Sequence, residues 1–247
     1  MTIENYNPNW YYHGVLNEEE QKIIRNDFTP YIADESNFVF HPEWDCNVRL
    51  SSYSEKPAPW NTFLMATNRC FGEFKEQTGQ KKPYTIVNGN LWINKYSTGY
   101  NQECHTHCNP EVNLSMVYFY QLDDSDKLSF RFYHPENGQY MMSGLSEFLD
   151  LPLYQTFIPE IQEGSLIIFP SFYPHSVAPV KAEGKERITF SGNMFLTQQN
   201  WQDRNLFDTG VQRNLQSGPD QHWKYSGDTN SVNTTFGSTP MPGMMGF

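Results

Sequence analysis

The apolar positions near the start of the chain recur with the spacing of an amphipathic helix. Ile23, Ile24 and Phe28 share one helical face, and the three residues that follow Asn17 are all glutamates. Carboxylates in a first turn stabilise a helix because they face the positive end of its dipole, and Asn17 is a suitable cap. We expect this helix to end at Pro30, because proline lacks the amide proton that a helix interior requires.

A second helical pattern covers about residues 57–78. Aromatic and aliphatic side chains recur there at every third or fourth position, and Gly79 follows them. Glycine commonly ends helices because it adopts a left-handed backbone conformation without strain. Residues 31–56, between the two patterns, are turn-rich and irregular.

From Tyr84 onward, apolar and polar positions alternate with a period of two, which is typical of strands. The strand-like runs cover residues 84–96, 100–108, 113–122, 127–133, 155–161, 164–169, 174–180 and 186–196. Short strands in this number after helices predict a mainly β fold, a double-stranded β-helix of the jelly-roll or cupin-like type, with the N-terminal helices on its outer sheet. We expect one domain over residues 1–200, with a helical part at 1–80 and the barrel at 84–196.

The chain changes in character after the barrel. Residues 216–247 are rich in Gly, Ser, Asn, Thr and Pro and carry few apolar side chains. A segment of this composition buries too little apolar surface to form a core of its own. We expect residues 201–247 to be a polar C-terminal extension that is either flexible or ordered by a protein partner.

The composition excludes several classes of protein. The chain has 247 residues, and its 17 Lys and Arg against 28 Asp and Glu give a net charge of −11. That charge argues against a partner such as DNA or RNA, whose phosphates require a basic surface. Four cysteines are too few for a disulfide scaffold, and no apolar run is long enough to span a membrane. The first residues lack the pattern of a signal peptide, so we expect a cytoplasmic protein of a bacterial or phage-infected cell.

Three histidines are candidate metal ligands. His105 and His107 stand two positions apart in a strand-like run, so their side chains point to the same face, about 7 Å apart. His175 begins a distant strand-like run. Two ligands from one strand and a third from another form a facial site with open positions, as non-haem Fe(II) requires to bind oxygen and a co-substrate. Each histidine alone has an ordinary structural explanation, so the prediction depends on their combination.

A candidate anion site follows His175. Strand alternation places Arg187, Thr189, Ser191 and Asn193 on one face of the last run. An arginine that points inward from a buried strand is unusual and indicates a binding role. A guanidinium beside a hydroxyl is well suited to bind a carboxylate. The ordinary alternative is a surface ion pair of Arg187 with a nearby glutamate.

The remaining histidines and the cysteines give no second site. Cys104 and Cys108 flank the histidine pair and suggest zinc, but alternation places Cys104 on the face opposite His105. A closed tetrahedral zinc site cannot be assembled from five consecutive extended residues. The other histidines lie in irregular, polar or turn segments, at positions His13, His41, His134 and His222.

Four stretches resemble the Fe(II)- and 2-oxoglutarate-dependent oxygenase superfamily. They are WINKYSTGYNQECHTH from Trp92, NLSMVYFYQL from Asn113, GSLIIFPSFYPHSVAPV from Gly164 and RITFSGN from Arg187. The similarity covers about residues 84–196 and is greatest to a little-characterised branch that is often encoded by phages and marine bacteria.

The resemblance implies an enzyme with a double-stranded β-helix, Fe(II) as cofactor and 2-oxoglutarate as a small-molecule co-substrate. It implies that His105 and His175 bind iron, and that Arg187 with Thr189 binds the C5 carboxylate of 2-oxoglutarate. The expected function is dioxygenase oxidation of an unidentified substrate, with hydroxylation as the favoured reaction.

The sequence departs from the superfamily at one ligand. His107 stands where the superfamily usually has Asp or Glu. Three neutral imidazoles leave the ion with a charge of +2, which favours anionic co-ligands but changes the electronics of oxygen activation. Glu103 shares the expected face of the two histidines and is a candidate to orient a ring N–H.

Two alternatives stay open. The spacing of the first histidine motif also resembles a cupin, which would add Glu111 as a ligand and would not require Arg187 or 2-oxoglutarate. The missing carboxylate and the long C-terminal extension are also compatible with a non-catalytic jelly-roll module, for instance a virion-associated structural protein that docks through that extension.

Overall fold

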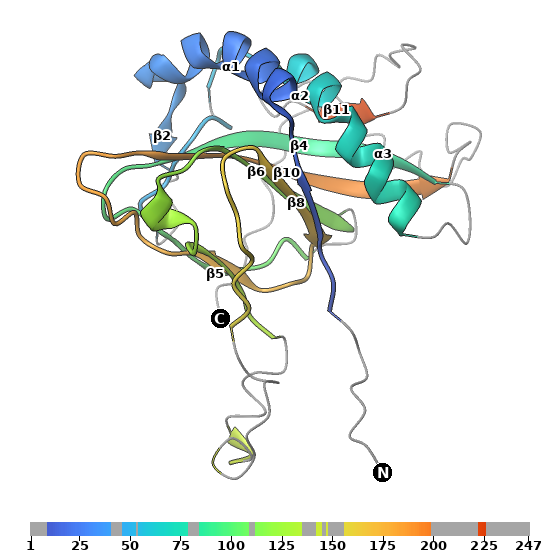
Figure 1. Ribbon diagram of the computed structural model, residues 1–247, viewed down its shortest axis with the longest axis vertical. Helices are drawn as coiled ribbons and strands as arrows, with labels where there is room; N and C mark the ends of the chain where they lie inside the picture. The colour runs from blue at the N-terminus through green and yellow to red at the C-terminus, as the bar shows by residue number, and fades with distance from the viewer. Residues whose placement is uncertain are drawn as a thin grey trace.

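Two antiparallel sheets face each other in the computed structural model, and a layer of helices covers the outer face of the larger one (Figure 1). The structure describes residues 9–40, 46–52, 54–78, 84–108, 112–134, 142–144, 147 and 156–198, and the backbone of 222–225. The larger sheet has the order β1-β8-β6-β10-β4-β3-β2, with β11 also beside β4, and the smaller has the order β5-β9-β7. The predicted mainly β, jelly-roll class is confirmed.

The elements follow the chain with three helices before the long strands. The strands are β1 (Tyr12–Val15), β2 (Val39–Phe40), β3 (Arg49–Leu50), β4 (Tyr84–Tyr96), β5 (Gln102–His105), β6 (Leu114–Gln121), β7 (Phe130–Phe132), β8 (Ser165–Pro170), β9 (His175–Val177), β10 (Arg187–Gln198) and β11 (His222–Tyr225). The helices are α1 (Glu18–Ala33), α2 (Trp60–Ala66) and α3 (Asn68–Gln77), with short 3₁₀ turns η1 (Glu35–Asn37) and η2 (Asp124–Asp126).

The first helix is longer than the sequence predicts. The predicted cap is present, because Asn17 Oδ1 accepts the Glu20 backbone N–H at 2.9 Å. The helix continues through Pro30, however, and ends at Ala33. Phe28 and Ile32 lie on either side of the proline and are both buried. Burying each contributes about 1.5–3 kcal/mol, which offsets the roughly 3 kcal/mol that proline costs inside a helix.

The second helical pattern is divided in two. Thr67 separates α2 from α3, with a ψ of −2°, and its hydroxyl donates to the Phe63 carbonyl at 2.8 Å. A threonine hydroxyl that bonds back to the preceding turn bends a helix. The single helix predicted over about 57–78 is therefore wrong at this residue, although the buried face is as expected.

Most of the predicted strands are present, but the run 155–161 is not a regular one. Among its described residues, Phe157 forms only an isolated bridge, with Phe132. Pro159 lies within this run and cannot donate a hydrogen bond to a neighbouring strand. Strand β1, which was not predicted from the sequence, pairs with β8 at the edge of the larger sheet.

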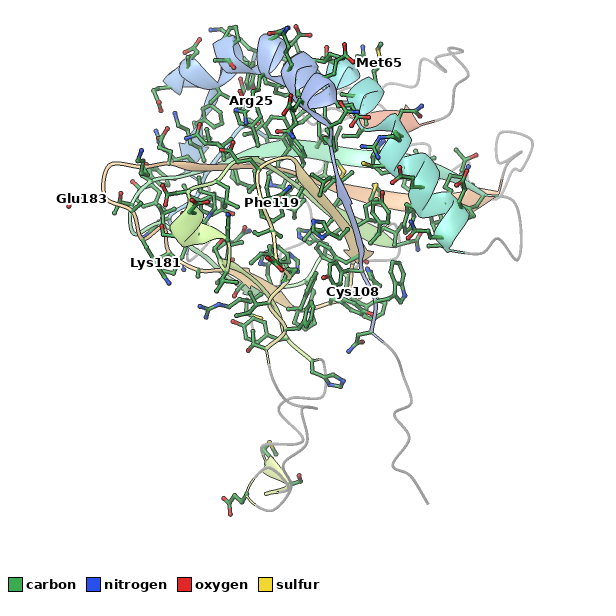
Figure 2. The ribbon with its side chains drawn as sticks, in the orientation of Figure 1. Arg25, Met65, Cys108, Phe119, Lys181 and Glu183 are labelled. Carbon is green, nitrogen blue, oxygen red and sulfur yellow. The ribbon has the colours of Figure 1, made fainter. Side chains whose placement is uncertain are left out.

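Apolar side chains form two cores, one on each face of the larger sheet. Phe190 of β10 packs toward the helices, with its ring centroid 4.6 Å from that of Phe28. Phe119 points into the space between the two sheets, whereas Met65 lies on the solvent side of the helical layer (Figure 2). The alternation predicted for the last strand is confirmed, because Thr189 faces the inter-sheet space and Ile188 faces the helices.

The C-terminal extension lies largely outside the described residues. The expectation that it is flexible or ordered by a protein partner therefore stays a prediction. The described part of the extension is β11, which pairs antiparallel with β4. Within the described residues, every helix is too short or too polar to cross a membrane.

Candidate functional site

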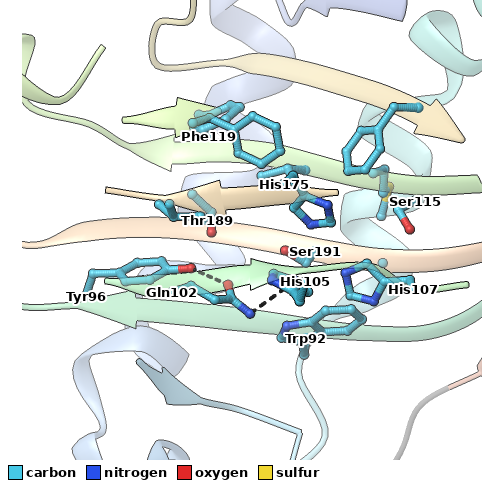
Figure 3. A pocket seen from close by; sticks show the side chains of 16 residues that line it. Trp92, Tyr96, Gln102, His105, His107, Ser115, Phe119, His175, Thr189 and Ser191 are labelled. Atoms are coloured by element: carbon cyan, nitrogen blue, oxygen red, sulfur yellow. Dashed lines mark hydrogen bonds between the residues drawn. The ribbon is translucent and has the colours of Figure 1, made fainter. Parts of the chain in front are cut away.

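The three predicted histidines come together between the two sheets (Figure 3). One ring nitrogen from each lies within 4.8 Å of the others. His105 ends β5 and His175 begins β9, and the two stand opposite each other in the ladder of the smaller sheet. His107 lies just past β5, where its backbone N–H donates to the Ser171 carbonyl at 2.8 Å. In the described part of the chain, these residues form the one group of metal-binding side chains that converge in this way.

Backbone carbonyls orient two of the three rings. His105 Nδ1 lies 2.9 Å from the Glu103 carbonyl oxygen, and His175 Nδ1 lies 2.9 Å from the Tyr173 carbonyl oxygen. A carbonyl oxygen only accepts, so each Nδ1 carries the proton and each Nε2 keeps its lone pair. This is how proteins usually orient histidines that bind a metal.

Burial keeps all three imidazoles neutral. It lowers the pKa of His107 to about 3 and that of His175 well below its usual value, with repulsion from the neighbouring histidines as a further cause. Burial also lowers the pKa of His105. Neutral imidazole is the form that binds a metal, so the site is in the right protonation state at neutral pH.

These shifts make the metal-free protein sensitive to acid. The pKa of His107 is about 3 in the folded protein and 6.5 ordinarily. Between these pH values the unfolded state therefore binds more protons than the folded state. The free energy of unfolding accordingly falls as the pH drops through this window. We expect His107→Gln to reduce the pH slope of the unfolding free energy by about 1.4 kcal/mol per pH unit below pH 6. Urea unfolding with a chelator at several pH values measures the slope, and equal slopes for both proteins would contradict the assignment.

The orienting group near His105 differs from the sequence prediction. The contact comes from the backbone carbonyl of Glu103, not from its carboxylate. The β5 ladder shifts between Gln102 and His105, so Gln102 lines the cavity and Glu103 does not. The Tyr96 hydroxyl donates to Gln102 Oε1 at 2.9 Å, and Gln102 Nε2 lies 3.4 Å from His105 Nε2 (Figure 3). Sequence alternation could not find Gln102, because a ladder shift is set by the tertiary fold.

Arg187 is fully buried at the start of β10. Its guanidinium lies over the Tyr96 ring, 4.5 Å from the centroid, and Nη2 donates to the Ala178 carbonyl at 2.8 Å. Among the described residues, Nε and Nη1 have no hydrogen-bond partner, although Nη1 lies 3.8 Å from Asp126 Oδ2. Burial lowers the pKa of Arg187, while Tyr96 and Asp126 oppose this effect. Unpaired buried donors are costly, and a carboxylate ligand would satisfy both of them.

A buried asparagine organises the neighbouring wall. Asn94 accepts from Trp92 Nε1 at 2.9 Å and donates to Thr189 Oγ1 at 3.1 Å and to Ser191 Oγ at 2.8 Å. Because an amide nitrogen only donates, both hydroxyls act as acceptors toward Asn94 and keep their own protons for another partner. Both Thr189 and Ser191 line the cavity, so they can donate to an anionic ligand there.

One cavity connects these groups. It spans about 410 Å³ of space that no atom occupies, part of which is open to solvent. Arg187 does not line this cavity, but the cavity reaches Tyr96, on which the guanidinium stacks, and Thr189, two positions along β10. Its lining combines the three histidines with polar and aromatic side chains, among them Trp92, Tyr96, Gln102, Phe119, Phe130, Phe169, Thr189 and Ser191.

Several other histidines and cysteines are rejected as metal ligands on the sequence alone. His13, Cys104 and Cys108, which the structure describes, do not line this cavity. His13 Nε2 lies 3.0 Å from the Ser165 hydroxyl, and both Cys104 and Cys108 are exposed. His41 and Glu111, the extra cupin ligand, lie outside the described residues.

The comparisons with known proteins agree with this geometry. Residues 90–193 match the family described as "Putative 2OG-Fe(II) oxygenase". The fold is similar to a Pseudomonas putida prolyl-4-hydroxylase, with a TM-score of 0.50 and 13% identity over 75% of this chain and 92% of that one. It is also similar to the non-haem α-ketoglutarate-dependent epimerase SnoN from nogalamycin biosynthesis, with a TM-score of 0.52 and 11% identity over 76% and 78% of the two chains.

A third similar structure is a Trichoplax adhaerens prolyl hydroxylase in complex with a peptide fragment of hypoxia inducible factor. Its TM-score is 0.50, with 12% identity over 76% of this chain and 84% of that one. At such identities the likeness shows the fold alone. No curated protein sequence matches the chain.

Proposed function

We propose that the chain is an Fe(II)- and 2-oxoglutarate-dependent oxygenase that hydroxylates a substrate at the cavity between its two sheets. The match of residues 90–193 to the family described as "Putative 2OG-Fe(II) oxygenase" supports this proposal. His105, His107 and His175 would hold Fe(II), and Arg187 with Thr189 would bind the C5 carboxylate of 2-oxoglutarate. The observation that carries the proposal is the convergence of three neutral, buried imidazoles within 4.8 Å of one another.

The residues fit the metal by their chemistry. Two Nε2 lone pairs are directed by backbone hydrogen bonds at the opposite Nδ1 atoms, and all three rings are neutral. When bound, Fe(II) with 2-oxoglutarate supplies the oxidising power, because decarboxylation of the co-substrate is coupled to reduction of O₂. Three neutral ligands leave the full +2 charge on the site, so His107 strengthens the attraction for an anionic co-substrate relative to a carboxylate at the same position.

The residues also fit a dicarboxylate. The two unpaired donors of Arg187 match the two oxygens of a carboxylate, and the Thr189 hydroxyl keeps its proton for a ligand because it accepts from Asn94. The Tyr96 ring supports the guanidinium from one face. Burial raises the pKa of Tyr96, so its hydroxyl stays protonated and remains a donor at neutral pH.

Aromatic side chains limit the access of water to the histidines. The Phe130 ring stacks on His175 at 5.5 Å between centroids, and the Phe169 ring meets the same imidazole edge-on at 5.0 Å. The Trp92 ring lies 5.8 Å from that of His107. A dry surrounding strengthens electrostatic interactions in the site and protects a reactive centre from side reactions.

The proposal is tested by turnover. Purified protein supplied with Fe(II), ascorbate, O₂ and 2-oxoglutarate should form succinate, slowly without substrate and faster with a substrate from a metabolite or peptide library. Mass spectrometry should then find the substrate gain one oxygen atom. His13→Ala is a matched control, since His13 bonds to Ser165 away from the cavity. Absence of succinate from iron-loaded protein would count against the proposal, and a product without added oxygen would count against hydroxylation.

A further inference from the structure

A buried carboxylate, that of Asp126, lies beside Arg187, the proposed anchor of the co-substrate. Asp126 ends the η2 turn and is 2% exposed. Its Oδ2 atom lies 3.8 Å from Arg187 Nη1, and its Oδ1 atom accepts the Lys181 backbone N–H at 3.4 Å. The Asp126 N–H donates to the Asp123 carbonyl and the Asp126 carbonyl accepts the Ser129 N–H, both at 2.9 Å, so backbone bonds hold this residue on both sides.

The separation of the two side chains determines what Asp126 does. Most hydrogen bonds between nitrogen and oxygen span about 2.7–3.2 Å, and a gap of 3.8 Å is too long for one, even compared with the 3.4 Å bond from Lys181. Accordingly, neither Nη1 nor Oδ2 has a hydrogen-bond partner within the part of the chain that the structure describes. The guanidinium is oriented instead by the Ala178 carbonyl and the Tyr96 ring. Asp126 therefore acts on Arg187 through its charge, and not by holding it in place.

The same charge acts against a second carboxylate. A ligand carboxylate that pairs with Nε and Nη1 of Arg187 would bring its own negative charge close to Asp126 in a buried region. Like charges that meet in such a place repel strongly. Before the ligand arrives, in contrast, Asp126 compensates the buried positive charge of Arg187 and so stabilises the empty site. Both effects make the free energy of binding a dicarboxylate less favourable.

We propose that Asp126 is a specificity-determining residue that weakens binding of dicarboxylates at Arg187, both of 2-oxoglutarate and of the succinate formed from it. The inference rests on the proposed function. Succinate keeps the distal carboxylate of 2-oxoglutarate, because the carbon lost as CO₂ comes from the other end. Asp126 therefore opposes retention of the product as well as binding of the co-substrate, and so favours product release.

The test is a comparison of ligand affinities in Asp126→Asn. Asparagine keeps the size of the side chain and the acceptor for Lys181, but it removes the charge. Calorimetry on Fe(II)-loaded protein under argon should show the dissociation constants for 2-oxoglutarate and for succinate each falling by about tenfold or more. The constant for 2-oxobutyrate, a 2-oxo acid without the second carboxylate, should stay unchanged. Asp124→Asn is the matched control, because Asp124 lies in the same turn with a side chain that is 91% exposed.

Each outcome decides one question. Unchanged or weaker binding of 2-oxoglutarate in Asp126→Asn would overturn the inference, as would an equal gain for 2-oxobutyrate. A lower melting temperature with no gain in affinity would assign Asp126 a structural role only. Wild-type protein that fails to bind 2-oxoglutarate at all would instead overturn the proposed function. If the asparagine variant does not fold, Asp126→Ser gives the same test with a smaller neutral side chain.

Discussion

His175→Ala is expected to abolish tight Fe(II) binding and, with it, all succinate formation. His175 is one of only three converging ligands in the described residues, and its Nε2 is directed by the bond from Nδ1 to the Tyr173 carbonyl. Loss of an outer-shell partner of a metal ligand alone costs 10–100-fold in affinity. Loss of the ligand itself should therefore weaken Fe(II) binding by more than about 100-fold.

The measurement for this variant is a competition titration of Fe(II) against a chromogenic chelator under argon. The alanine leaves a small space beside Phe130 and Phe169, so circular dichroism and thermal unfolding should confirm that the fold is retained. His13→Ala should bind Fe(II) like the wild-type protein. An affinity of His175→Ala within tenfold of wild type would show that the metal lies elsewhere.

Arg187→Met is expected to weaken 2-oxoglutarate binding by at least about 100-fold while Fe(II) binding is kept. Hydrogen bonds to charged groups contribute roughly 1.5–3 kcal/mol each, and Arg187 has two unpaired buried donors to offer. Methionine replaces much of the volume without the charge, and a loss confined to the co-substrate would assign Arg187 to the carboxylate and not to the metal.

The single substitution has a second effect that must be separated. It leaves Asp126 as an unpaired buried carboxylate, which typically destabilises a protein by about 3–5 kcal/mol. The double variant Arg187→Met with Asp126→Asn removes that charge, and it should recover stability without recovering 2-oxoglutarate affinity. Calorimetric titration of both variants, with thermal unfolding alongside, distinguishes the two effects. Wild-type affinity for 2-oxoglutarate in the double variant would contradict the anchor.

The chemistry of the site could be predicted from the sequence where strand alternation holds. The convergence of His105 and His175 follows from their places in two strand-like runs, and the inward face of β10 follows from the alternation of Thr189 with Ile188. Asn94 carried the same signal, since it lies between Trp92 and Tyr96 at a spacing of two on β4. Its role was missed because an asparagine in a strand has no distinctive motif.

Other features depend on tertiary packing that a local pattern does not contain. Residues 123–126 have a sequence typical of a turn between strands, which does not indicate burial, yet the fold buries Asp126 and leaves Asp124 exposed. The shift in the β5 ladder places Gln102 at the cavity in place of Glu103. Pro30 stays within α1 because the side chains around it are buried, which the local rule for proline does not take into account.

Three histidines that hold Fe(II) and an Arg187 that anchors 2-oxoglutarate beside it should produce a visible signal when both ligands bind. Anaerobic titration of the Fe(II)-loaded protein with 2-oxoglutarate, followed by visible absorption, measures this signal. We expect a charge-transfer band that saturates at one equivalent, is lost in His175→Ala, and needs far more 2-oxoglutarate in Arg187→Met. Absence of the band from iron-loaded wild-type protein, or a band that Arg187→Met leaves unchanged, would contradict this assignment.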